Sequence, residues 1–224
     1  MTMTSSSNLQ ETASAASFDA NEFISLATGQ MGTSDAYKLL TGVVVPRPIA
    51  WITTRSAAGV VNVAPFSSFN YVAHTPPLLA VNITLHDDGR IKDTARNIRE
   101  TGEFVVNIVP RAALDLMNQS SAEYPSDVSE ADAVGLDLID SQLVKPPRIA
   151  VSPVHMECRL SQVVPLGTGV NTLYIGEVVM FHLAGSVYDG RHVDSVAIDP
   201  VARLGGPFYA TLGEILQRKR PKAT

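Results

Sequence analysis

The chain has 224 residues, of which 45% are hydrophobic and 17% are charged, and its formal net charge is −5. This composition is typical of a globular protein with one large domain or two small ones, and it excludes disorder of the whole chain. No basic stripe interleaves with aromatic residues, which argues against nucleic-acid binding. The chain has no run of about 18 apolar residues, so no membrane-spanning helix is predicted.

A single cysteine, Cys158, excludes an internal disulfide and a cysteine-based zinc site. Residues 1–17 are rich in Ser, Thr and Ala, which predicts a mobile tail. They lack the cationic and apolar regions of a secretory signal. We therefore expect a cytoplasmic protein with a tail and lead-in over residues 1–33, a folded domain over 34–213 and a basic tail over 214–224.

The predicted elements begin with one or two helical turns over residues 34–40, after a capping Ser or Asp. In residues 43–70, two apolar runs flank a turn at 56–59, a pattern that predicts a β-hairpin. Two consecutive prolines then break the chain, and a third strand is expected over 78–85.

The clearest helix covers residues 91–101. Its residues Ile91, Ala95 and Ile98 share one face, and Gly102 stands where a left-handed residue ends a helix.

A strand over 104–109 and a short helix over 111–118 follow. Residues 120–153 have little periodicity, and such a long excursion is usually functional or mobile. Two long strands are then expected over 154–164 and 171–188. Six or seven strands with few short helices favour a closed or nearly closed β-barrel over a doubly wound sheet, in which helices of about 10–15 residues alternate with the strands.

The standard catalytic and nucleotide-binding motifs are absent, including G-x-x-x-x-G-K-[ST], G-x-G-x-x-G, G-x-S-x-G and H-E-x-x-H. The histidines show no metal-ligand spacing, and His86 is expected to be solvated. We therefore name no catalytic residue, and neither a protein-borne nucleophile nor a metal is indicated.

The segment Lys92-Asp93-Thr94 opens the clearest helix. A helix N-terminus offers free N–H groups and the positive end of the dipole, so Lys92 and the Thr94 hydroxyl would reinforce an anion site there. Alternatively, Asp93 or Thr94 simply caps the helix, and the Asp93 carboxylate would compete with a phosphate. Spacing alone leaves both interpretations open.

The hairpin carries two residues with more than one interpretation. Trp51 shares a strand face with Ile49 and Thr53, and a lone tryptophan there is more often a core residue than a ligand platform. Arg47 lies between two prolines and is held extended, which suits either a fixed ligand contact or a surface salt bridge.

A set of segments, specific only as a group, resembles one known family. These segments are Tyr37–Thr54, Asn62–Asn70, Lys92–Asn107, Met117–Pro125, Ile175–Val179 and Arg203–Gly206. Over about residues 35–213 the chain is similar to the flavin reductase-like, FMN-binding split-barrel family.

The resemblance implies a split β-barrel homodimer that holds FMN non-covalently near the subunit interface. The isoalloxazine would lie against residues 62–70, and the phosphate arm would run toward Lys92. Ser68 stands where the family more often has an aromatic residue. The implied cofactor-binding residues are Arg47, Trp51, Ile52, Thr53, Thr54, Asn62, Ala64, Pro65, Phe66, Ser67, Ser68, Asn70, Lys92, Asp93, Thr94 and Arg203.

The implied activity is that of an NAD(P)H-dependent flavin oxidoreductase, in which the flavin carries the chemistry. Two alternatives stay open: a flavoenzyme that reduces a small organic substrate, and a non-enzymatic FMN-holding electron carrier. The sequence also leaves FAD open in place of FMN. We expect residues 120–153 to cover the flavin or the partner subunit.

Overall fold

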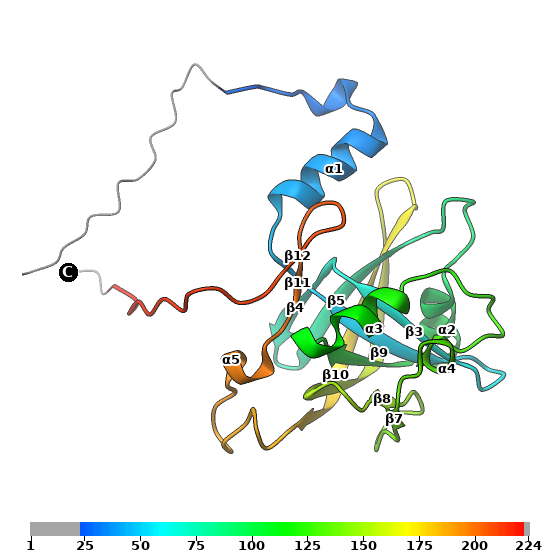
Figure 1. Cartoon of the computed structure of the whole chain (residues 1–224). Coiled ribbons are helices and arrows are strands. Elements are labelled where there is room, and N and C mark those ends of the chain that lie inside the picture. Colours follow the sequence, from blue (N-terminus) through cyan, green and yellow to red (C-terminus); the bar gives the residue numbers. More distant parts are fainter. Residues whose placement is uncertain (1–22, 222–224) are drawn as a thin grey trace, which may run out of the picture. The chain divides into compact units, whose positions relative to one another are not determined.

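The computed structural model describes residues 23–221 (Figure 1). They fall into two compact units, one ending at Tyr37 and the other beginning at Lys38. The 3-10 helix η2 (Thr28–Gln30) lies in the first unit, and helix α1 (Thr33–Val43) runs across the boundary. Most of the predicted N-terminal tail and the last three residues of the basic tail lie outside the described residues.

A seven-stranded antiparallel sheet dominates the second unit, with the strand order β3-β2-β6-β9-β10-β5-β4. Its strands are β2 (Ala50–Arg55), β3 (Val61–Phe66), β4 (Phe69–His74), β5 (Pro77–Thr84), β6 (Glu103–Ile108), β9 (Val154–Leu166) and β10 (Asn171–Leu183). Strand β3 also contacts β5, so the two ends of the sheet approach each other. The predicted split β-barrel is confirmed.

The remaining elements are short. Strands β1 (Arg47–Pro48), β11 (Ala202–Arg203) and β12 (Tyr209–Ala210) form one small sheet, and β7 (Leu138–Ile139) and β8 (Arg148–Ile149) form another. Besides the end of α1, the helices described in the second unit are α2 (Asp93–Thr101), η3 (Arg111–Ala113), α3 (Leu114–Gln119), α4 (Glu130–Val134) and α5 (Ser195–Ile198). Among residues 23–221, no helix has the length and apolar character needed to cross a membrane.

Strand β2 is buried on both faces. Ala50 and Ile52 point into the barrel core, where Ile98 of α2 joins them. Trp51 belongs to a second core outside the barrel, which includes Met117 of α3. Because both faces are covered, β2 is apolar without the alternation of a half-exposed strand.

The predicted strand pattern was wrong between residues 67 and 77. The hairpin was expected to end at Asn70, but β4 continues to His74 and pairs with β5. Thr75 and Pro76 form the turn of this second hairpin, and Pro77 is the first residue of β5, opposite His74. A proline is tolerated as the first residue of a strand, which is why the pair does not break the sheet here.

Two other boundaries differ from the predictions. Helix α2 begins at Asp93 and not at Ile91. The expected end of this helix is confirmed, because Gly102 has φ 72° and its N–H donates to Ile98 O. The strand expected to reach residue 188 ends at Leu183, and Tyr188 makes only an isolated bridge.

The excursion over residues 120–153 is fixed to the barrel by a buried carboxylate. Glu157 on β9 has no exposed surface. Its oxygens accept hydrogen bonds from the backbone N–H groups of Gln142 (2.8 Å), Leu143 (2.6 Å) and Val144 (3.1 Å), and His182 Nε2 lies 2.6 Å away. These groups hold the segment 142–144 against β9.

Two more buried side chains fasten the same excursion. The Thr53 hydroxyl donates to Pro147 O (2.5 Å). The amide of Asn107 accepts from the Ile149 N–H (3.0 Å) and donates to Trp51 O (2.9 Å). The excursion is therefore a packed layer over β2 and β6, not an unattached loop.

We expect Glu157→Gln to lower the free energy of unfolding by about 2–3 kcal/mol, because the new NH2 group faces backbone N–H donors. Burial raises the pKa of Glu157, but the N–H groups of Gln142 and Leu143 and the ring of His182 outweigh it, so the pKa lies below its ordinary value of 4.5. This stabilisation is complete above pH 4.5 and is lost as the pH falls through the lowered pKa.

Urea unfolding between pH 3 and 7 tests this prediction, with the exposed Glu177→Gln on β10 as a control. The control should be nearly neutral. If Glu157→Gln were as stable as wild type at pH 7 and lost stability equally on acidification, the hydrogen bonds of Glu157 would not contribute to stability.

Candidate functional site

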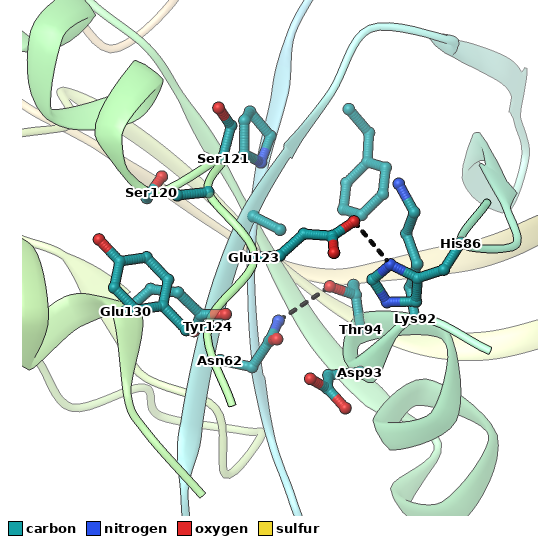
Figure 2. Close-up of a pocket in the computed structure, with 14 residues that line it drawn as sticks. Asn62, His86, Lys92, Asp93, Thr94, Ser120, Ser121, Glu123, Tyr124 and Glu130 are labelled. Carbon is teal, nitrogen blue, oxygen red and sulfur yellow. Dashed lines mark hydrogen bonds and ion pairs between the residues drawn. The ribbon is translucent and has the colours of Figure 1, made fainter. Parts of the chain in front are cut away.

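A cavity of about 120 Å³ lies where β3 meets the N-terminus of α2 (Figure 2). Its walls come from β3, from the loop before α2, from the first turn of α2 and from the start of the excursion. The lining residues are Asn62, Ala64, Pro65, Phe66, His86, Lys92, Asp93, Thr94, Ser120, Ser121, Ala122, Glu123, Tyr124 and Glu130.

The cavity brings together two predicted segments that are about 30 residues apart in the chain. Part of the predicted site lines this cavity, namely Asn62, Ala64, Pro65, Phe66, Lys92, Asp93 and Thr94. The others do not line it: Arg47, Trp51, Ile52, Thr53, Thr54, Ser67, Ser68, Asn70 and Arg203. Of these, Ser68 and Asn70 are exposed on the open surface beyond Phe66.

Four predicted residues of β2 have no exposed surface, namely Trp51, Ile52, Thr53 and Thr54. Trp51 is a core residue and not a ligand platform, as its place on a strand favoured. Its indole Nε1–H donates to the Ser120 hydroxyl (2.9 Å), which in turn donates to Met117 O (2.8 Å). Trp51 therefore positions a residue of the cavity wall without lining the cavity itself.

The two predicted arginines bind backbone carbonyl groups. Arg47 donates to three of them, including Thr41 O (2.5 Å) and Leu204 O (2.9 Å). Arg203, opposite Arg47 in the β1–β11 pair, donates to Gly206 O (2.7 Å). Among the described residues neither forms a salt bridge, and these contacts account for both side chains as supports of the small sheet.

The floor of the cavity is a hydrogen-bonded group of three side chains. The Asn62 amide lies 2.8 Å from Thr94 Oγ1 (Figure 2). Each donor around this amide meets an acceptor when the amide oxygen accepts from the Thr94 hydroxyl and the amide nitrogen donates to Glu130 Oε1 (3.2 Å). Glu130 also accepts the Val63 N–H (2.8 Å). Burial raises the pKa of Glu130 more than the Val63 N–H lowers it, and the negative Asp93 raises it further.

The interpretation that Asp93 or Thr94 caps α2 is wrong. Lys92 is the N-cap residue, and no described side chain caps the helix. Asp93 instead pairs with Arg96 and accepts from the Ser126 hydroxyl (2.9 Å). The N–H groups of the first turn, which have no partner within a helix, therefore remain available at the cavity wall.

The expectation that His86 is solvated is also wrong. Its side chain is only 17% exposed, and Nδ1 lies 3.0 Å from Glu123 Oε1 (Figure 2). Sequence reasoning did not include His86, Glu123 or Glu130 among the site residues. In the sequence, only the resemblance of Met117–Pro125 to the family indicated that this part of the chain lies at the site.

The donor set fits a phosphate monoester. The start of α2 provides N–H groups and a positive dipole end, and no described carboxylate pairs with Lys92. Three carboxylates of the lining oppose an anion: Asp93 is partly neutralised by Arg96, Glu123 lies beside His86, and burial raises the pKa of Glu130. Ala64 and Phe66 supply an apolar wall beside these donors.

The cavity is too small to enclose a whole nucleotide-sized ligand. Its volume of about 120 Å³ is below the roughly 300–1,000 Å³ typical of small-molecule pockets. It would take one end of an elongated ligand, and the rest would lie along the open surface beyond Phe66.

Comparisons with known proteins agree with this architecture. Residues 42–197 match the model of the flavin reductase like domain. The uncharacterized protein YwrF of Bacillus subtilis is 41% identical over 198 residues, which cover 86% of this chain and 96% of YwrF.

Two solved structures are also similar. Nitrilotriacetate monooxygenase component B from Bacillus cereus has 37% identity and a TM-score of 0.85, covering 89% of this chain and all of that chain. The 2-nitrobenzoate 2-nitroreductase NbaA of Pseudomonas fluorescens has 32% identity and a TM-score of 0.79, covering 88% and 96%. The chain therefore belongs to the flavin reductase-like family of split-barrel flavoproteins.

Proposed function

We propose that the protein binds FMN and acts as an NAD(P)H-dependent flavin oxidoreductase. The observation that carries the proposal is the cavity at the start of α2, where an uncapped helix end, Lys92 and the apolar end of β3 meet in a chain of this family. A bound flavin would supply the hydride and electron chemistry, and the protein would bind and orient it.

In this proposal the phosphate lies against the first turn of α2 and Lys92. The ring system extends along the end of β3 and over residues 67–70, whose backbone and small side chains meet its polar edge. Ser68 is exposed and small, so it leaves the ring open to an electron donor on that side.

A homodimer would complete this site. Strand β4 is an edge strand next to the proposed ring position, and Tyr71 (72% exposed) and Val72 (52% exposed) present apolar surface there. Exposed apolar edges of this kind commonly mark interaction surfaces. A second copy on β4 would cover the part of the flavin that the small cavity leaves exposed.

A second candidate activity is direct reduction of a nitroaromatic substrate by a retained flavin. It is supported by the 32% identity with a 2-nitrobenzoate nitroreductase, whose chain is matched over 96% of its length. The two activities differ in whether the flavin leaves the protein.

Steady-state kinetics with NADH and NADPH tests the proposed activity, after the absorption spectrum of the purified protein has been recorded. We expect oxidation of one nicotinamide donor to depend on added FMN. Turnover of 2-nitrobenzoate without added flavin would instead support the second candidate. A colourless protein that neither binds FMN nor oxidises either donor would rule out both.

We expect Lys92→Ala to weaken FMN binding by about tenfold and riboflavin binding hardly at all, because only FMN carries a phosphate for the ammonium group to bind. Fluorescence titration with both ligands measures the difference. The exposed Lys145, which lies outside the cavity, gives the control variant Lys145→Ala. Equal weakening of FMN and riboflavin would reject the phosphate role of Lys92.

We expect wild type to be a dimer by light scattering and Tyr71→Asp to shift it toward monomer, because burying a carboxylate in an apolar interface is unfavourable. The variant should also bind FMN more weakly. Ile139→Asp, at an exposed position of β7, should change neither property. A wild-type protein that stays monomeric at micromolar concentration with FMN present would contradict this assembly.

A further inference from the structure

Residues 120–126, here named the closing segment, connect to α2 and its preceding loop by two polar bridges. His86 Nδ1 and Glu123 Oε1 lie 3.0 Å apart, and the Ser126 hydroxyl donates to Asp93 Oδ1 (2.9 Å). Figure 2 shows the first bridge between the His86 loop and the closing segment, beside Lys92 and Thr94. Both bridges join elements that are more than 30 residues apart in the chain.

The closing segment is fixed at both ends. At its start, the buried Ser120 is held by the Trp51 indole. Just beyond its end, Ser129 caps α4 by accepting from the Asp132 N–H, and Glu130 binds the Val63 N–H. Movement of the segment would therefore be confined to the residues between these anchors.

The two bridges are weak in comparison with these anchors. Glu123 is 73% exposed in its pair with His86, and exposed ion pairs of this kind add little stability. A ligand that needs more room at the start of α2 could therefore open the segment, but it would lose both bridges in doing so.

We propose that these bridges make the protein select FMN over FAD, an inference that rests on the proposed flavin binding. With the bridges closed, Ser121, Ala122 and Glu123 bound a cavity of only about 120 Å³. A terminal phosphate monoester ends inside this space. FAD continues from the same phosphate into a second phosphate and an adenosine, which must pass the closing segment.

Repulsion by the charge of Glu123 is an alternative cause of such a preference, and a matched pair of variants separates it from closure. FAD carries its negative charges past the Glu123 carboxylate, so repulsion alone would also disfavour it. Glu123→Gln removes the charge but keeps an amide that hydrogen-bonds to His86. Glu123→Ala removes both the charge and the bridge.

The experiment measures dissociation constants for FMN, FAD and riboflavin by fluorescence titration of the full chain. We expect wild type to prefer FMN. Glu123→Ala should lower the FMN-to-FAD preference about two- to fivefold, and Glu123→Ala combined with Ser126→Ala should lower it about tenfold. Glu123→Gln should keep the wild-type preference, as should Asp88→Ala, which removes an exposed carboxylate paired with Arg90 outside the cavity.

The outcomes separate this inference from the proposed function. If wild type binds no flavin, the proposed function fails. If wild type binds FMN and all variants keep its preference, or wild type binds FMN and FAD equally, the closing segment does not select the ligand. If Glu123→Gln lowers the preference as much as Glu123→Ala, charge repulsion replaces closure as the cause. Circular dichroism confirms that each variant is folded.

Discussion

The architecture around the cavity depends on one buried charge. A carboxylate without exposed surface is stable only if its oxygens receive hydrogen bonds, and Glu157 receives them from three successive amides of the excursion and from His182. The excursion is thereby bound to β9 by polar contacts as well as by the apolar contacts of the second core. Because the excursion is held there, the outer face of β2 is covered, and Trp51 can reach Ser120 at the cavity wall.

The inner core places the other half of the site. Ala95 and Ile98 of α2 pack into the barrel with Ile52, which sets the helix against β2 and β3. The amide of Asn97 donates to the Thr54 hydroxyl (3.0 Å), and Thr94 contacts Asn62 one strand further out. These contacts fix the N-terminus of α2 beside the end of β3. The anion-binding groups and the apolar wall are thus neighbours because of how the helix is packed.

Much of the fold could be predicted from the sequence because its signals are local. The hairpin of β2 and β3 and the ending of α2 at Gly102 follow from apolar runs and one turn residue. Strand β4 was missed because a proline pair usually breaks a chain, whereas here Pro76 lies in a tight turn and Pro77 begins the next strand. For the site, the helix start at Lys92–Thr94 indicated a possible anion site, and the family resemblance added the segment Asn62–Phe66. The roles of Glu157, Glu130 and His86 were not predictable, since their partners lie from 13 to 67 residues away and no periodicity links them.

The excursion over residues 120–153 combines a fixed part with a movable part, and this combination is what a flavin site on an open surface requires. The fixed anchors at Ser120 and Glu130 keep the cavity in place before any ligand arrives, so little order has to be created on binding. The exposed bridge of Glu123 to His86 is weak enough to break during ligand entry. A site rigid throughout would bind the phosphate end well but admit it slowly. A site loose throughout would lose the distinction between one phosphate and two.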